Sequence, residues 1–144
     1  MRIKEFLLVY FIGSVGYRFI EILWRGRTHW TMGIIGGICL LFIYYFEKKS
    51  SLDLYKKALI STLFITFSEL ISGIIINRIF QLDVWDYSNI RFNILGQISL
   101  LYSFLWYALC IPAHVMCKIL RHRVLDALPK SGFKKLKGSR VFGR

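Results

Sequence analysis

The sequence lacks the short motifs that mark several kinds of functional site. Its three cysteines, Cys39, Cys110 and Cys117, have no CxxC spacing and lie in or beside apolar runs. We interpret them as small buried hydrophobic residues, which excludes a disulfide framework and a zinc site. The chain also has no HExxH motif, no paired acidic motif near a histidine and no G-x-x-x-x-G-K-[ST] loop. The sequence therefore predicts no metal, no other cofactor and no P-loop binding of ATP by this chain itself.

Acidic residues are also few, with 8 Asp and Glu against 20 Lys and Arg, although 56% of the 144 residues are hydrophobic. A soluble domain of this length cannot hide that much apolar surface in one core. The apolar residues are instead concentrated in four segments, at about 6–24, 31–46, 58–79 and 92–111. Each segment is near the ~20 residues that a helix needs to cross a bilayer, and lipid leaves no partner for open backbone groups. The sequence predicts an all-α, polytopic membrane protein with four transmembrane helices.

The basic residues predict the orientation of these helices. Of the 20 lysines and arginines, 15 lie in the N-terminus, in the segment between the second and third spans, or after the fourth span. By the positive-inside rule, both termini of this cell-membrane protein are expected in the cytoplasm. Two short loops, at 25–30 and 80–91, then face outward. We expect Trp24, Trp30 and Trp85 to mark the outer interface.

The C-terminal part of the chain is strongly basic. Pro112 is expected to kink or end the fourth helix, and residues 115–128 then predict a basic, amphipathic helix along the inner surface. Residues 1–128 would form the transmembrane domain, and residues 129–144 a flexible cytoplasmic tail. Because charge after a last span usually sets topology and contacts anionic lipid, we expect the tail to bind anionic lipids and no nucleic acid.

Polar residues recur inside the third span at helical spacing. They form a stripe of five residues, Thr62, Thr66, Glu69, Gly73 and Asn77. Asn93 and Gln97 make a similar four-residue step at the outer end of the predicted fourth helix. Charges inside a membrane are costly and usually face the interior of a bundle. Glu69, near the middle of the span, is therefore expected to point inward.

Further polar groups lie in and after the first span. Arg18 and Glu21 are three residues apart and can pair. With the outer loops, these groups predict a polar pocket in the outer half of the bundle. Its candidate ligand-binding residues are Arg18, Glu21, Arg25, His29, Glu69, Asn77, Trp85, Asp86, Asn93 and Gln97. The alternative is that such groups only fasten helices together, at roughly 1 kcal/mol per hydrogen bond or less, and that His29 is an interfacial residue.

The stretch that begins at Glu69 resembles a known family. It contains Glu69-Leu-Ile-Ser-Gly73, then Trp85-Asp86-Tyr87-Ser88, then Phe92-Asn93-Ile94 with Gly96. The ABC-transporter type IV (CmpB-like) membrane proteins share this glutamate-containing helix, this loop and this Asn-Ile-x-Gly sequence. Gln97 stands where the family commonly has an arginine. The resemblance implies a multi-pass membrane protein related to transport, and it suggests that Asp86 or Ser88 caps a helix start beside Trp85.

Three hypotheses for the function follow. The first is a transport-related component that acts as a homo-oligomer or with a partner membrane subunit, because four helices are too few to enclose a wide path. Glu69 would be its proton- or cation-sensitive group, and Glu21 with Arg18 a gate or counter-ion pair. The second is a membrane-embedded enzyme for a lipid or envelope precursor, which is less favoured because no nucleophile–base pair is visible. The third is an assembly or regulatory subunit whose polar groups are fasteners.

Overall fold

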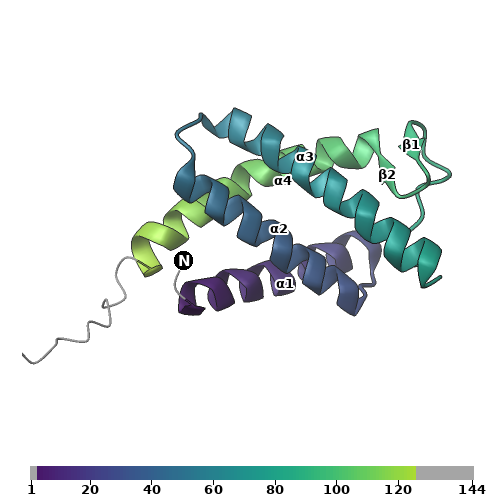
Figure 1. Cartoon of the computed structure of the whole chain (residues 1–144), viewed down its shortest axis with the longest axis horizontal. Helices are drawn as coiled ribbons and strands as arrows, with labels where there is room; N and C mark the ends of the chain where they lie inside the picture. Colours follow the sequence, from purple (N-terminus) through teal and green to yellow (C-terminus); the bar gives the residue numbers. More distant parts are fainter. Residues whose placement is uncertain (1–2, 126–144) are drawn as a thin grey trace, which may run out of the picture.

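The computed structural model describes residues 3–125 and shows four long helices (Figure 1). They are α1 (Ile3–Arg25), α2 (Trp30–Lys49), α3 (Leu54–Gly73) and α4 (Leu100–Ile119). A π-helical turn continues α3 as η1 (Ile74–Ile79), and another continues α4 as η2 (Leu120–Leu125). Within the described residues, four helices are long and apolar enough to cross a membrane. The prediction of an all-α membrane protein with four spans is confirmed, and its exposed apolar side chains contact the bilayer.

The helices run in alternating directions and pack chiefly in two pairs. α1 packs along α2, α3 packs along α4, and α2 also contacts both α3 and α4. The start of α1, the α2–α3 connection and the end of α4 lie at one end of the bundle (Figure 1). The α1–α2 connection and the segment between η1 and α4 lie at the other end. α2 therefore provides most of the contact between α1 and the rest of the bundle.

The fourth span differs most from its prediction. Residues 92–99 do not begin a helix but carry two short antiparallel strands, β1 (Asn93–Ile94) and β2 (Ile98–Ser99). Leu95 and Gly96, between them, have φ values of 53° and 69°, which a right-handed helix excludes. Ser99 then caps α4, since its Oγ accepts a hydrogen bond from the Tyr102 amide. The expectation that Asn93 and Gln97 lie on the fourth helix is wrong.

Pro112 does not end α4, which continues through it to Ile119 and on into η2. Proline removes one backbone donor, and transmembrane helices tolerate this loss where neighbouring groups satisfy the freed carbonyl. Up to Leu125, the expected basic helix is thus a continuation of α4 and not a separate surface helix. The rest of that segment and the tail at 129–144 lie outside the described residues.

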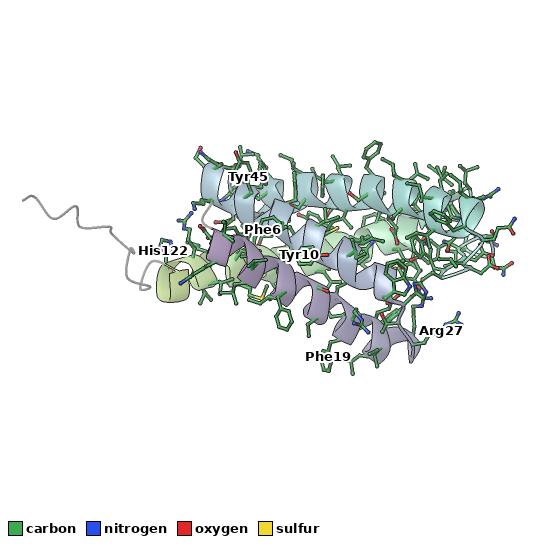
Figure 2. The ribbon with its side chains drawn as sticks, turned by 60° about the horizontal axis from the view of Figure 1, so that its bottom comes forward. Phe6, Tyr10, Phe19, Arg27, Tyr45 and His122 are labelled. Carbon is green, nitrogen blue, oxygen red and sulfur yellow. The ribbon has the colours of Figure 1, made fainter. Side chains whose placement is uncertain are left out.

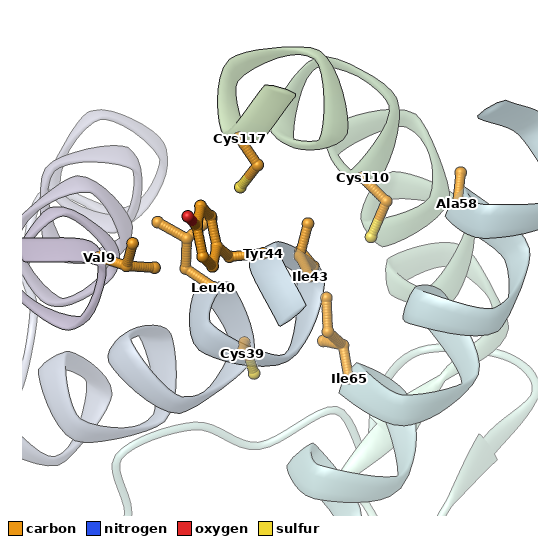
Figure 3. Packing of buried hydrophobic residues seen from close by; sticks show 9 residues of the cluster. All are labelled: Val9, Cys39, Leu40, Ile43, Tyr44, Ala58, Ile65, Cys110 and Cys117. Atoms are coloured by element: carbon orange, nitrogen blue, oxygen red, sulfur yellow. The ribbon is translucent and has the colours of Figure 1, made fainter. Parts of the chain in front are cut away.

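Nine buried residues from all four helices form the main hydrophobic cluster (Figure 3). It contains Val9, Cys39, Leu40, Ile43, Tyr44, Ala58, Ile65, Cys110 and Cys117. The three cysteines are free and buried, as their apolar neighbours in the sequence predict. They contribute to packing and carry no crosslink.

Glycines bring α1 and α2 into close backbone contact. A Cβ added to Gly13 would lie 2.6 Å from the carbonyl oxygen of Gly36, and one added to Gly36 would lie 2.8 Å from the carbonyl oxygen of Gly13. Gly36 also lies directly against the Cβ of Tyr17. These neighbours are backbone or first side-chain atoms that cannot swing away. Small residues at such a crossing allow the van der Waals contact that holds membrane helices together.

A buried polar cluster joins α2, α3 and α4 near the end of the bundle that holds the α2–α3 connection. Glu47 Oε2 lies 3.0 Å from both Lys57 Nζ and His114 Nδ1, and His114 Nε2 lies 2.9 Å from Ser61 Oγ. The order serine, histidine and carboxylate also occurs in hydrolases. Here, however, Ser61 and His114 have no exposed surface. We therefore interpret this cluster as a fastener of three helices.

Candidate functional site

The segment between η1 and α4 is held in place by Asn77. Its Nδ2 donates to the Trp85 carbonyl at 2.9 Å and to Gln97 Oε1 at 2.8 Å, and its Oδ1 accepts from the Val84 amide at 2.8 Å. Trp85 Nε1 in turn donates to the Gln97 carbonyl at 3.0 Å. Trp85 is only 4% exposed, so the expectation that it anchors the outer interface is wrong. Asn77 reaches both ends of the segment and so fixes its path.

This segment places Tyr87 against the glutamate of α3. Tyr87 Oη donates to Glu69 Oε1 at 3.0 Å, and Trp106 Nε1 from α4 donates to Glu69 Oε2 at 3.1 Å. Glu69 is 5% exposed and has no ion-pair partner among residues 3–125. Burial and the neighbouring Glu69 carboxyl raise the pKa of Tyr87 well above its usual range, so its phenol stays a donor. Two neutral donors, and not a cation, satisfy this buried carboxyl.

The space beside Glu69 is small. A cavity of about 20 Å³ lies among Glu69, Tyr17, Gly36, Trp85 and Trp106, together with other apolar residues. That volume holds about one water molecule. The arrangement provides no wide path through the centre of the bundle at this level.

A much larger groove lies between α1 and α4, with a volume of about 310 Å³. Its lining includes five apolar residues from the two helices, Ile20, Trp24, Leu105, Ala108 and Leu109. Tyr17 and Trp106 line both this groove and the small cavity at Glu69. Their rings stack with centroids 5.4 Å apart. We call these two residues, with Tyr87, the aromatic wall, because they separate Glu69 from the groove.

Glu21 and Arg25 form the polar end of the groove. Glu21 is buried, and it accepts from Arg25 Nη1 at 2.9 Å and from Thr28 Oγ1 at 2.6 Å. Arg25 Nη2 also donates to the Val84 carbonyl at 2.5 Å, which ties α1 to the segment after η1. The expected pair of Glu21 with Arg18 is wrong. Arg18 is exposed, and its carbon chain lies beside Gly33 of α2.

A second, polar pocket adjoins the groove at this end and has a volume of about 160 Å³. It shares Glu21 and Arg25 with the groove and also contains Arg27, Thr28, His29 and Asp83. His29 is the N-cap of α2, where its Nδ1 accepts from the Thr31 amide. Arg27 lies at the end of the bundle away from His122, beyond the end of α1 that carries Phe19 (Figure 2). The pocket is therefore built at the α1–α2 connection.

Asp86 and Asn93 lie apart from these spaces and shape the loop. Asp86 Oδ1 accepts from the Ser88 amide at 2.8 Å and from Ser88 Oγ at 2.5 Å, and these bonds lower the pKa of Asp86. Asp86 thus closes a turn and caps no helix. Asn93 Nδ2 donates to the Ile90 carbonyl at 2.7 Å, while its Oδ1 accepts from the Gly96 amide at 3.0 Å. Both residues stabilise the loop and contact neither the groove nor the polar pocket.

The structure thus divides the ten ligand-binding residues predicted from the sequence into four groups. Glu21, Arg25 and His29 meet at the polar pocket, Glu69 lies behind the aromatic wall, and Asn77, Trp85 and Gln97 form the buried frame of the loop. Arg18, Asp86 and Asn93 lie outside. Within residues 3–125, no group of three or more His, Cys, Asp or Glu side chains gathers in a way that could hold a metal ion.

The sequence interpretation missed the aromatic wall. Tyr17, Tyr87 and Trp106 come from three separate parts of the chain, and tyrosines and tryptophans in such proteins usually indicate the membrane interface. One signal was present in the sequence. Tyr17, Glu21 and Arg25 recur every four residues and therefore share one face of α1.

A protein-family model described as "Putative ABC-transporter type IV" matches residues 8–138 of the chain. The match extends the resemblance of the stretch from Glu69 to Gly96 to all four helices. No curated protein and no solved structure matches the chain. The family therefore supplies the functional context, and the chemistry must be argued from the site.

Proposed function

The chain belongs to the family described as "Putative ABC-transporter type IV", and from this premise we propose that it is a transport-related membrane component that holds its substrate in the groove between α1 and α4. The observation that carries the proposal is the groove itself, at about 310 Å³ against about 20 Å³ beside Glu69. A substrate would thus enter from the side of the bundle and not pass through its centre. Since the chain has no P-loop, a partner subunit would supply any nucleotide chemistry.

In this proposal Glu69 is the proton-sensitive group behind the groove. Its two oxygens both accept hydrogen bonds, from Tyr87 and from Trp106, and both donors also line the groove. A protonated Glu69 would carry an O–H donor of its own. This donor would face the donor of Tyr87 or Trp106, and two donors cannot bond to each other. The aromatic wall would then rearrange, and the groove would widen. A buried ionisable residue in a membrane span is often a group of this kind.

The proposed orientation places the groove towards the outer leaflet. The α2–α3 connection lies at the same end of the bundle as the start of α1 and the end of α4 (Figure 1). This connection and the ends of its two helices carry four lysines, Lys48, Lys49, Lys56 and Lys57. The positive-inside rule then favours cytoplasmic termini in the cell membrane, with the polar pocket on the outer face.

A second candidate is an assembly or regulatory subunit. It is favoured by the complete satisfaction of the polar groups, since no buried side-chain nitrogen or oxygen among the described residues lacks a hydrogen bond. In that case Glu69 would be a fastener, like Glu47 at the other end of the bundle. The two candidate functions differ in whether the protonation state of Glu69 affects the width of the groove.

Alkylation of a cysteine placed in the groove distinguishes them. Ala108→Cys places a thiol in the groove, and Phe104→Cys places one on the same helix, exposed and outside the groove. The measured quantity is the rate of maleimide reaction of Ala108→Cys divided by the rate of Phe104→Cys. This ratio removes the effect of pH on the thiol itself, because both thiols titrate. Both would be made with Cys39, Cys110 and Cys117 replaced by alanine. We expect this ratio to rise by about 3-fold or more as the pH falls and Glu69 gains its proton.

Glu69→Gln is the matched variant for this measurement. Its amide cannot titrate, so the ratio of rates should stay constant with pH. The transport proposal loses its support if the ratio has the same pH dependence with Glu69 and with Glu69→Gln, or if neither changes. Glu69 would then be interpreted as a structural residue that only holds helices together.

A further inference from the structure

We propose that the groove and the polar pocket together bind one zwitterionic phospholipid, with an acyl chain between α1 and α4 and the headgroup between Arg27 and Asp83. This inference rests on the proposed function, because it names the class of molecule that the groove would hold. It goes further by assigning the headgroup contacts. These contacts come from Arg27 and Asp83, which take no part in the hydrogen bonds of Glu69.

The groove has the lining and the opening that an acyl chain needs. Its walls are largely apolar, with Ile20 from α1 facing the same space as Leu105 and Leu109 from α4. α1 packs chiefly on α2, and α4 packs chiefly on α3 and α2, so the space between α1 and α4 opens sideways. In a membrane this side faces hydrocarbon, and lipid chains are the apolar molecules present there.

The polar pocket lies where the headgroup of such a lipid would be. It shares Glu21 and Arg25 with the groove, so the two spaces meet at this pair. The pocket is at the α1–α2 connection, at one end of two helices that are long enough to span the bilayer. A lipid whose chain follows α1 would therefore have its phosphate level with this pocket.

The charges in the pocket select the kind of headgroup. Glu21 and Arg25 pair with each other at 2.9 Å, and Arg25 also binds the Val84 carbonyl. Arg27 and Asp83 are exposed and form no ion pair within the described part of the chain. One unpaired cation and one unpaired anion complement a headgroup that carries a phosphate and an ammonium group. A guanidinium binds phosphate oxygens well, and a carboxylate accepts from an ammonium group.

An anionic headgroup without an ammonium group fits less well. Its phosphate could still contact Arg27, but Asp83 would then face a negative charge without a cation between them. The arrangement therefore favours phosphatidylethanolamine over phosphatidylglycerol with the same chains.

Native mass spectrometry of the full-length protein, delipidated in detergent and titrated with each of these two lipids, tests the proposal. We expect one molecule of phosphatidylethanolamine to bind, with an affinity at least about 5-fold higher than that of phosphatidylglycerol. Asp83→Asn should abolish this preference, whereas Arg27→Gln should weaken both lipids. Ala108→Phe should prevent binding of either lipid, because its ring fills the groove. Arg91→Gln and Asp53→Asn, which remove exposed charges outside the pocket, are the matched controls and should bind as the unchanged protein does.

Equal binding of the two lipids by the unchanged protein would overturn the headgroup assignment, and unchanged binding by Ala108→Phe would overturn the groove as the chain site. If Arg27→Gln failed to fold, Asp83→Asn in the exposed loop would decide the same question. The cysteine experiment separates the two proposals. A pH-dependent groove without lipid preference would refute only the lipid, whereas lipid preference with a pH-independent groove would refute only the role of Glu69.

Discussion

Asn77→Ala is expected to detach the segment between η1 and α4 and to lower the free energy of unfolding by roughly 3 kcal/mol or more. The substitution leaves three groups without their partner, namely the Trp85 carbonyl, the Gln97 side chain and the Val84 amide. Each buried polar group left unsatisfied costs about 1–3 kcal/mol. The loss would spread to the site, because the same segment holds Tyr87 against Glu69. Unfolding in detergent, with limited proteolysis of residues 80–99, measures both effects.

Two further variants make the Asn77 result specific. Asn89→Ala changes an exposed asparagine of the same segment and should alter stability by less than about 0.5 kcal/mol. Asn77→Asp keeps the acceptor for Val84 but loses both donated bonds, so it should also destabilise. If Asn77→Ala were as stable and as protease-resistant as Asn89→Ala, Asn77 would not organise the loop.

Gly36→Ala is expected to have the second largest effect, a loss of roughly 2–3 kcal/mol through forced separation of α1 from α2. The added methyl group would lie 2.8 Å from the Gly13 carbonyl oxygen and directly against the Cβ of Tyr17. Neither atom can move without moving α1. Because α1 is joined to the bundle chiefly by α2, the strain would also displace Tyr17 from the aromatic wall.

Gly16→Ala is the matched control for Gly36→Ala. A Cβ at Gly16 would meet nothing within 4 Å, so the helix should gain up to about 1 kcal/mol from the better helix propensity of alanine. Midpoints of thermal unfolding in detergent should therefore move in opposite directions for the two variants. A similar midpoint for both would mean that α1 and α2 are not in close contact at Gly36.

The sequence was sufficient to predict the four spans, because long apolar runs separated by charged segments have no other stable form in a single short chain. It was not sufficient for the start of α4. The residues from Phe92 to Leu101 are mostly apolar and continue without a break into the helix. Their path depends on left-handed backbone at Leu95 and on bonds from Asn77, which lies 20 residues before Gln97. Apolar pattern alone carries no information on such contacts.

In the candidate site, the sequence is likewise not sufficient to predict which residues pair. Spacing places Glu21 within reach of a basic residue either three positions before it or four positions after it. The choice of Arg25 over Arg18 is made by Val84, whose carbonyl binds Arg25 from 59 residues away, and by Thr28 across the loop. Trp85 is a similar case. A tryptophan in a short loop usually lies at the interface, but Asn77 and Gln97 draw this one into the bundle.

In the proposed function, the protein holds its ligand in the groove between α1 and α4. The most direct measurement is a structure of the protein in nanodiscs of phosphatidylethanolamine with brominated acyl chains. Bromine density is expected between α1 and α4, beside Ile20, Leu105 and Leu109, with the headgroup at Arg27 and Asp83. A structure in which α1 packs directly on α4, with no lipid between them, would contradict the claim.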